Sequence, residues 1–412
     1  MEMDETATAN ESVVSTTPEI CYFEQPPLTN FRFWLVAVFG TSVSFVSIVN
    51  NIILFYVFMT RKHHRSNHNM YLLLLAFFDI FVSTAYIFLM SVNVLIDYLV
   101  STWLMQLWFM YMVPMITISH VAMTSSSFLI VCASFERYCI TVNSSFLPFA
   151  QNNRKLIAGL AILLGVISKG SMCLEFELID VPECEGLITQ TQMRYPDFVF
   201  GTPYNIVWRF WYRNFVTIFA PFFILAYFNI RIVKALTRHT KMTVCQLAGN
   251  ALVEQAKRKA TARAATRTLV MVVCCYLISN IISVALTIWE HLDKKSLTDE
   301  YLNMYAVLVD LVSLLTTSAC ACRLPIYLTC QAPLRQEVKE VVMSLLCLSK
   351  TKDEDNEYLM LSKPSNASRN TNGNISTRDS DDTYIDKKIS ETVLTTPNGA
   401  QNSTANAYET LL

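Results

Sequence analysis

Charged residues are scarce in this chain of 412 residues, since only 16% are Asp, Glu, Lys or Arg, whereas 53% are hydrophobic. A soluble domain usually has about a quarter charged residues, so the deficit argues against a soluble fold and favours lipid as the solvent. Glycine and proline are also few, with 9 and 13 residues. Their scarcity argues against a loop-rich or low-complexity chain. The formal net charge of −1 gives no indication of a nucleic-acid partner.

Several functional signatures are also absent. The sequence contains no Walker motif and no zinc-ligand spacing, so we expect no enzymatic activity, no cofactor and no metal. Secondary transporters tend to have two related halves and interrupted helices, and neither is visible. A transporter is therefore the weaker alternative. Most of the 12 cysteines lie inside apolar runs, where a thiol acts as a small hydrophobe rather than as part of a disulfide framework.

Long apolar segments are what the chain does contain. A helix that crosses a membrane needs roughly 20 mostly apolar residues. Seven segments qualify: 33–60, 68–95, 104–138, 154–174, 208–236, 262–290 and 303–330. The fourth segment carries Lys169 near its far end. We predict an all-α fold, a seven-transmembrane helix bundle over residues 33–330.

Lysine and arginine in the short loops predict the orientation of the bundle. The first, third and fifth loops are basic. Their cations are Arg61, Lys62, Arg65, Arg154, Lys155, Arg238, Lys241, Lys257, Arg258, Lys259, Arg263 and Arg267. The opposite side is acidic, with Glu2, Asp4, Glu5, Glu11, Glu19, Glu24, Glu175, Glu177, Asp180, Glu183, Glu185 and Asp197. We therefore expect a multi-pass plasma-membrane protein with its N-terminus extracellular and its C-terminus cytoplasmic.

The two ends of the chain lie outside the bundle. Residues 1–32 have no cationic start and no short apolar run, so we expect an extracellular segment rather than a cleaved signal peptide. Asn10 in Asn-Glu-Ser is a glycosylation acceptor there. The basic, Ala-rich residues 246–268 are expected to extend the sixth helix into the cytoplasm.

Residues 331–348 have an apolar face at helical spacing, which predicts a short helix in the membrane interface. Cys347 is a lipidation candidate there, with an unmodified thiol as the alternative. Residues 349–412 are rich in Ser, Thr, Asn and Asp and predict a disordered cytoplasmic tail. The chain ends in Thr410-Leu411-Leu412, which has the form of a PDZ-domain ligand, although chance matches are frequent.

Polar residues inside the spans indicate function, because they are costly in a bilayer. Asp79 lies midway along the second span, and Glu136-Arg137-Tyr138 closes the third. Tyr327 ends the seventh span in Arg-Leu-Pro-Ile-Tyr. Ser126 and Asn280 add polar groups to the third and sixth spans.

Together these motifs resemble the rhodopsin-like family of G-protein-coupled receptors, over about residues 33–348. Glu136-Arg137-Tyr138 matches the D/E-R-Y motif of that family, Asp79 matches its intramembrane aspartate, and residues 323–327 occupy the place of N-P-x-x-Y. The resemblance implies an extracellular ligand, a heterotrimeric G protein that meets Arg137 in the active state, and arrestin recruitment by a phosphorylated tail. Alternatively, Arg137 merely follows the positive-inside rule.

A narrower likeness suggests the ligand. The run 175–177, the stretch 211–229 and Trp289-Glu290 look like invertebrate FMRFamide-type and myosuppressin-type neuropeptide receptors. Ser119 stands where bioamine receptors of the family have an aspartate, so an amine ligand is not expected. The acidic outer surface fits a basic ligand, such as an amidated peptide that ends in Arg-Phe.

Five residues are candidates to bind this ligand. Glu290 is the first choice for pairing with a ligand arginine, and His120, Met123, Trp211 and Trp289 are candidates to line the pocket. Two alternatives remain open: the acids form a solvated loop surface, and the aromatics serve packing. A chemosensory receptor for small external molecules is the alternative function.

The chain departs from the family pattern in its disulfide. Members usually join the second outer loop to the third span, but Met112 stands about where the cysteine of that span should be. Cys184 supplies the loop half. Cys21 is the only other clearly extracellular thiol, so we predict a Cys21–Cys184 bond, with Cys173 as the competitor.

The seventh and sixth spans also depart from the pattern. Arg323 replaces the usual asparagine opposite Asp79, in a place where the family often holds a sodium ion. We predict that Arg323 pairs with Asp79 and takes the place of the ion, the alternative being that Arg323 extends to the cytoplasmic face.

No proline occurs in 262–290 of the sixth span, so any bend of that helix must arise otherwise, for instance from Asn280 bonding to the backbone. No acid lies in 258–270 to restrain Arg137, which predicts measurable basal activity.

Overall fold

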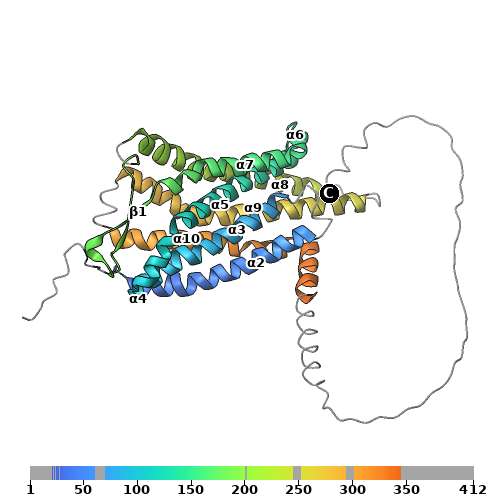
Figure 1. Cartoon of the computed structure of the whole chain (residues 1–412). Coiled ribbons are helices and arrows are strands. Elements are labelled where there is room, and N and C mark those ends of the chain that lie inside the picture. The colour runs from blue at the N-terminus through green and yellow to red at the C-terminus, as the bar shows by residue number, and fades with distance from the viewer. Residues whose placement is uncertain are drawn as a thin grey trace, which may run out of the picture. The chain divides into compact units, whose positions relative to one another are not determined.

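The computed structural model describes residues 21, 23, 25–26, 28–60, 70–199, 202–244, 252–293 and 301–344. In these ranges, seven helices are long and apolar enough to cross a membrane (Figure 1). They run over Thr29–Thr60, Met70–Leu99, Thr102–Val142, Arg154–Leu174, Phe215–Arg238, Arg263–Glu290 and Asn303–Cys330. The predicted seven-helix bundle is confirmed.

Several of the seven helices are built from more than one element. The first consists of α1 (Thr29–Arg32), the π-helical η2 (Phe33–Gly40) and α2 (Thr41–Thr60), and the second of α3 (Met70–Tyr86), η4 (Ile87–Ser91) and α4 (Val92–Leu99). The third is α5 (Thr102–Val142), which is followed by the short α6 (Leu147–Asn152), and the fourth is α7 (Arg154–Gly170) with η5 (Ser171–Leu174). The fifth joins η7 (Tyr204–Tyr212), η8 (Phe215–Phe219) and α8 (Ala220–Val244). The sixth is α9 (Leu252–Leu292), and the seventh is α10 (Leu302–Ala321) with α11 (Arg323–Cys330).

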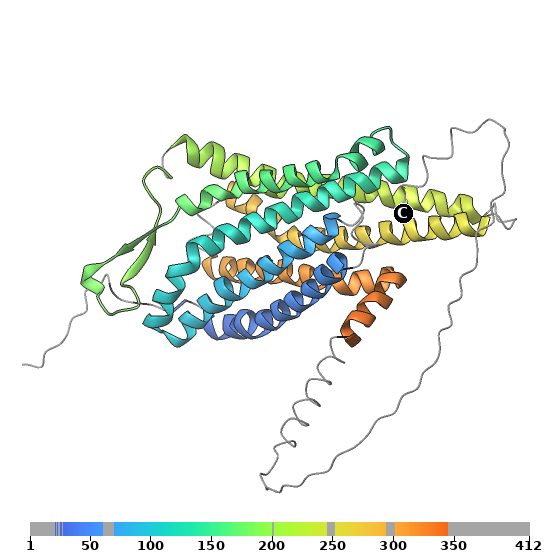
Figure 2. The same cartoon turned by 45° about the vertical axis from the view of Figure 1, so that its right-hand side comes forward.

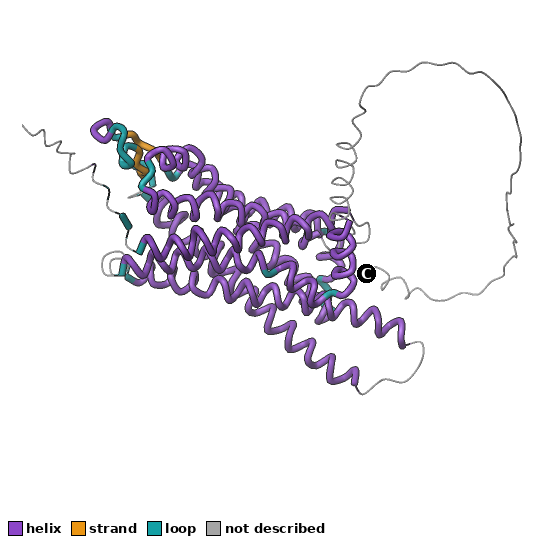
Figure 3. Tube along the Cα trace, turned by 90° about the horizontal axis from the view of Figure 1, so that it is seen from below, coloured by secondary structure: helices purple, strands orange, loops and turns teal. Residues whose placement is uncertain are grey.

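The two ends of the bundle differ in structure. At one end, β1 (Glu177–Asp180) pairs antiparallel with β2 (Thr191–Arg194), with Glu177 opposite Arg194. Figures 1 and 2 show this hairpin at the end opposite α6, and Figure 3 shows its strands in orange beyond the purple helices. We call these two ends the hairpin end and the Glu136 end, since α5 reaches Glu136 shortly before it ends.

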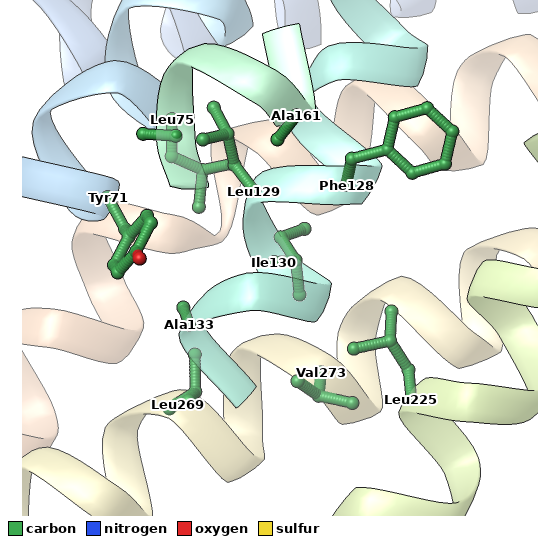
Figure 4. Packing of buried hydrophobic residues seen from close by; sticks show 11 residues of the cluster. Tyr71, Leu75, Phe128, Leu129, Ile130, Ala133, Ala161, Leu225, Leu269 and Val273 are labelled. Carbon is green, nitrogen blue, oxygen red and sulfur yellow. The ribbon is translucent and has the colours of Figure 1, made fainter. Parts of the chain in front are cut away.

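The third helix, α5, organises the core. It packs against α3, α7 and α8. Figure 4 shows Leu129 and Ile130 of α5 among side chains of the neighbouring helices, including Leu75, Leu225 and Val273. Outward-facing side chains such as Trp34 (66% exposed) and Ile278 (66% exposed) are also apolar. An apolar exterior around an apolar core is what a bilayer requires of a spanning bundle.

Beyond α11, residues 332–344 form a further helix. Leu334, Val338 and Val341 are buried at 1%, 6% and 7% exposure, so the helix has one apolar face, as the sequence predicts. The chain divides into two units, residues 1–341 with the bundle and residues 342–412. Asn10, Cys347 and the tail 349–412 with Thr410–Leu412 lie outside the described residues, and their predictions stay untested.

Candidate functional site

A cavity of about 580 Å³ lies between the helices. A site of this size can hold a ligand of drug-like dimensions. Its wall includes residues of six of the seven helices, all but the first. Side chains near the hairpin end, such as Lys169 and Phe176, share the cavity with Asp79 and Arg323, which lie deeper in the bundle. The cavity therefore connects the hairpin end with the intramembrane polar residues.

Asp79 and Arg323 form an ion pair in the cavity wall. Arg323 Nη1 lies 2.5 Å from Asp79 Oδ2, and the side chains are 7% and 1% exposed. Burial removes water from both charges, and each charge therefore depends on the other. The alternative in which Arg323 extends to the membrane surface does not occur in the structure.

Neighbouring polar groups fix the position of this pair. Arg323 Nη2 donates to Ser126 Oγ at 3.5 Å, which brings Ser126 into the same cluster. Asn51, fully buried on α2, donates to the carbonyl oxygen of Cys320 at 3.2 Å, close to the point where α10 gives way to α11. Side chains of three helices thus meet at the pair, and Asn51 ties the first helix to the seventh nearby.

Glu136 pairs with an arginine that the sequence analysis counted only as a loop cation. Arg154, at the start of α7, donates to Glu136 through Nε at 2.9 Å and Nη2 at 2.6 Å. This bidentate pair is buried, with side chains 9% and 6% exposed. The carboxylate next to Arg137 is therefore held by α7.

The other candidate coupling residues lie at the same end of the bundle. Tyr138 stacks on Phe228 of α8, with ring centroids 5.4 Å apart. Tyr327 is buried at 1% exposure against Phe58. Its hydroxyl has no hydrogen-bond partner among the residues that the structure describes.

Asn280 bonds to the backbone, as the sequence analysis suggested. Its Nδ2 donates to the carbonyl oxygen of Tyr276 at 2.8 Å, and Ser279 Oγ donates to the same oxygen at 2.9 Å. Two side-chain donors on one carbonyl compete with the helical hydrogen bond of that turn. The helix α9 nevertheless continues from Leu252 to Leu292.

Only two of the five ligand candidates line the cavity. His120 and Met123 do, and Trp211, Trp289 and Glu290 do not. Trp211 borders a separate groove of about 170 Å³ between the fifth and sixth helices and is 58% exposed, whereas the ring of Trp289 packs against Tyr301. Trp211 and Trp289 therefore lie outside the cavity wall, and the predicted pairing of Glu290 with a ligand arginine stays a prediction.

Glu175 also departs from its expected place. The sequence predicts that it belongs to the acids of the outer surface, but its side chain is fully buried. Its Oε1 accepts from Arg213 Nη1 at 2.5 Å and from the Tyr204 hydroxyl at 2.7 Å. Its Oε2 lies 3.4 Å from Arg209 Nε. Burial raises the pKa of Tyr204, so the hydroxyl remains a donor to this carboxylate.

A disulfide joins Cys21 to Cys184, the pair that the sequence analysis predicts, and Cys173 is free. The place where the family usually has a cysteine is taken by Met112, which is buried at 1% exposure. The disulfide therefore ties the hairpin to the N-terminal segment. No group of three or more His, Cys, Asp or Glu suited to a metal occurs within the described ranges.

Two charged residues at the site were overlooked in the sequence. Lys169 interrupts the apolar sequence of the fourth span, yet it lines the cavity. Arg154 was assigned to a loop, yet it neutralises Glu136. The sequence could have indicated both roles, because a charged residue within or beside a membrane span needs an ion-pair partner or a cavity.

The fold and the site define a seven-helix membrane protein whose ligand-sized cavity reaches a buried aspartate. The family model described as 7 transmembrane receptor (rhodopsin family) matches residues 50–322, and the chain belongs to this family. Its members are receptors rather than enzymes. No curated protein matches the chain.

Proposed function

We propose that the protein is a G-protein-coupled receptor of the plasma membrane. The ligand enters the cavity from the hairpin end, and the G protein binds at the Glu136 end. The observation that carries this proposal is the continuous cavity, whose wall includes both Lys169 near the hairpin end and the Asp79–Arg323 pair. A ligand there can change the packing around the pair, and the motif Glu136-Arg137-Tyr138 lies further along α5 from the cavity residues His120 and Met123.

The distribution of exposed charge supports the orientation. Exposed acids surround the hairpin, at Glu177, Asp180, Glu183 and Glu185. The described part of the Glu136 end carries exposed cations, at Lys155, Lys234 and Arg238. Since positive residues remain on the cytoplasmic side, the hairpin end is extracellular in this proposal.

The ligand that we propose is an extracellular peptide with basic residues. The exposed acids of the hairpin would attract its cationic side chains. The described residues that line the cavity offer no free carboxylate to a ligand arginine, because Asp79 is the only acid among them and is paired with Arg323. Basic residues would therefore contact the rim, and another part of the peptide would enter the cavity.

A small external molecule is the second candidate ligand. A mainly apolar cavity of about 580 Å³ is sufficient to enclose one. The site of expression separates the two candidates. Expression in sensory cilia favours the small molecule, and expression in interneurons or muscle favours the peptide.

The proposal is tested in cells that express the full chain with a promiscuous G protein. A library of synthetic peptides, each in free-acid and amidated form, is screened for calcium release. The matched control is Arg137→Gln, which should reach the cell surface in equal amount without signalling. Responses that persist in this variant, or the absence of basal and stimulated signals from a surface-expressed receptor, would contradict the proposal.

A further inference from the structure

The hairpin-end part of the cavity has an excess of positive charge. Lys169 on α7 lines it and carries a positive charge, whereas His120 on α5, which also lines it, is an imidazole that is mostly neutral at pH 7. Arg213 is buried close by, and its charge interacts with both residues. Among the described residues of the cavity wall, Asp79 is the only acid, and it is deeper and already neutralised by Arg323.

The charge of Glu175 attracts Lys169, but its carboxylate oxygens bind other groups. Its carboxylate is taken by Arg213 at 2.5 Å and Arg209 at 3.4 Å, and it also accepts from the Tyr204 hydroxyl. Three cations, Lys169, Arg209 and Arg213, therefore surround one anion. The guanidinium of Arg213, 2.5 Å from the carboxylate, already balances the charge of Glu175, and Lys169 forms no ion pair with it.

Lys169 has no hydrogen bond or ion pair with any residue that the structure describes. An ammonium has three donors and no acceptor. A lysine on a membrane-spanning helix without a partner is costly, unless its charge meets water or a ligand in a cavity. Lys169 is thus an unused donor in the wall of the cavity, beside apolar residues such as Met172.

We infer that the cavity recognises a ligand with an anionic group, in the simplest case a carboxylate, which pairs with Lys169. This inference rests on the proposed receptor function. The apolar body of the ligand would extend toward Met123 and Tyr276, which also line the cavity. An amidated C-terminus has no carboxylate. A peptide ligand would therefore present a free C-terminus or an acidic side chain to Lys169 and its basic residues to the hairpin.

The experiment measures thermal stabilisation of the purified full chain in detergent by small probes. The probes are 3-(indol-3-yl)propanoate, its uncharged primary amide, and phenyl phosphate. A charge-assisted contact contributes at least ~1.5 kcal/mol, which corresponds to about tenfold in affinity. The carboxylate should therefore act at a concentration about tenfold below that of the amide. The carboxylate and the phosphate ester show which anion the site prefers.

Variants assign the effect to the residue. Lys169→Met should abolish the preference for acid over amide, and Lys169→Arg should retain it. The matched control is Lys155→Met, which removes an exposed lysine from the other end of the same helix. The inference is overturned by equal potency of acid and amide on the native chain, by a preference that survives Lys169→Met, or by no stabilisation at millimolar probe. Because no G protein takes part, failure here is distinguishable from failure of the receptor function.

Discussion

The buried Asp79–Arg323 pair predicts that a second substitution rescues the damage done by the first. The atoms are 2.5 Å apart. At an effective dielectric constant of about 20, two unit charges at this distance attract by roughly 7 kcal/mol, most of which offsets their desolvation. Removal of one partner leaves the other charge buried alone and costs about 3–5 kcal/mol. Removal of both avoids that penalty.

The variants are Asp79→Asn, Arg323→Met and the double variant. Each single variant should lower the apparent melting temperature in detergent and the amount of receptor at the cell surface. The double variant should recover most of both quantities, with a coupling energy of about 2–3 kcal/mol. Losses that simply add in the double variant would refute the ion pair as the reason for Arg323.

The same pair predicts that sodium has no effect on the receptor. The guanidinium of Arg323 already neutralises the carboxylate to which a cation would bind. Replacement of sodium by a bulky organic cation should therefore leave the melting temperature unchanged in the native chain. A sodium-dependent shift in the native chain would show that the carboxylate remains available to ions.

Three further predictions follow from particular contacts. Arg154→Met should destabilise the receptor by about 3–5 kcal/mol, and Glu136→Gln should restore part of the loss; no restoration in thermal unfolding would refute the pair. Gly165→Ala should cost about 1–3 kcal/mol by the same measure, because the added Cβ would lie 2.2 Å from Ser125 Oγ and 3.1 Å from its backbone nitrogen. Gly159→Ala is the control, since nothing lies within 4 Å of its Cβ, and equal losses would contradict the argument. Reduction of the disulfide should lower the melting temperature, because the unfolded chain regains conformational entropy worth at most about 5 kcal/mol. An unchanged melting temperature would show that the disulfide does not restrain the unfolded chain.

Much of the fold was predictable from the sequence because the signals are local sums. A window of about 20 apolar residues identifies a spanning helix without knowledge of its neighbours. The ends of the seven helices agree with the predicted segments within a few residues at most ends, although helix already begins at Tyr204. The start of α9 at Leu252 agrees with the predicted extension of the sixth helix over 246–268. The pairing of Arg323 with Asp79 was predictable for a related reason, since a buried arginine requires an acid and the spans contain few.

The lining of the cavity was not predictable, because it depends on which face each helix turns inward. Trp211 lies in η7, a π-helical stretch over Tyr204–Tyr212. A π-helical turn bonds i to i+5 and changes the register that α-helical spacing assumes. Trp211 consequently faces a separate groove, whereas Lys169, which hydropathy treats as a defect, faces the cavity.

The sequence by itself determined that the chain is a seven-helix membrane protein and that its few intramembrane charges need partners. The sequence predicts the pairing of Arg323 with Asp79, but only the tertiary structure decided the partners of the other charges. Glu136 could have paired with the adjacent Arg137, but the packing of α7 on α5 brings Arg154 to it at 2.6 Å. Glu175 could have stayed on the surface, but it forms a buried ion pair with Arg213. Lys169 remains without an ion pair in the wall of the cavity. Charge composition is a property of the chain, whereas pairing depends on distances that exist only once the helices have packed.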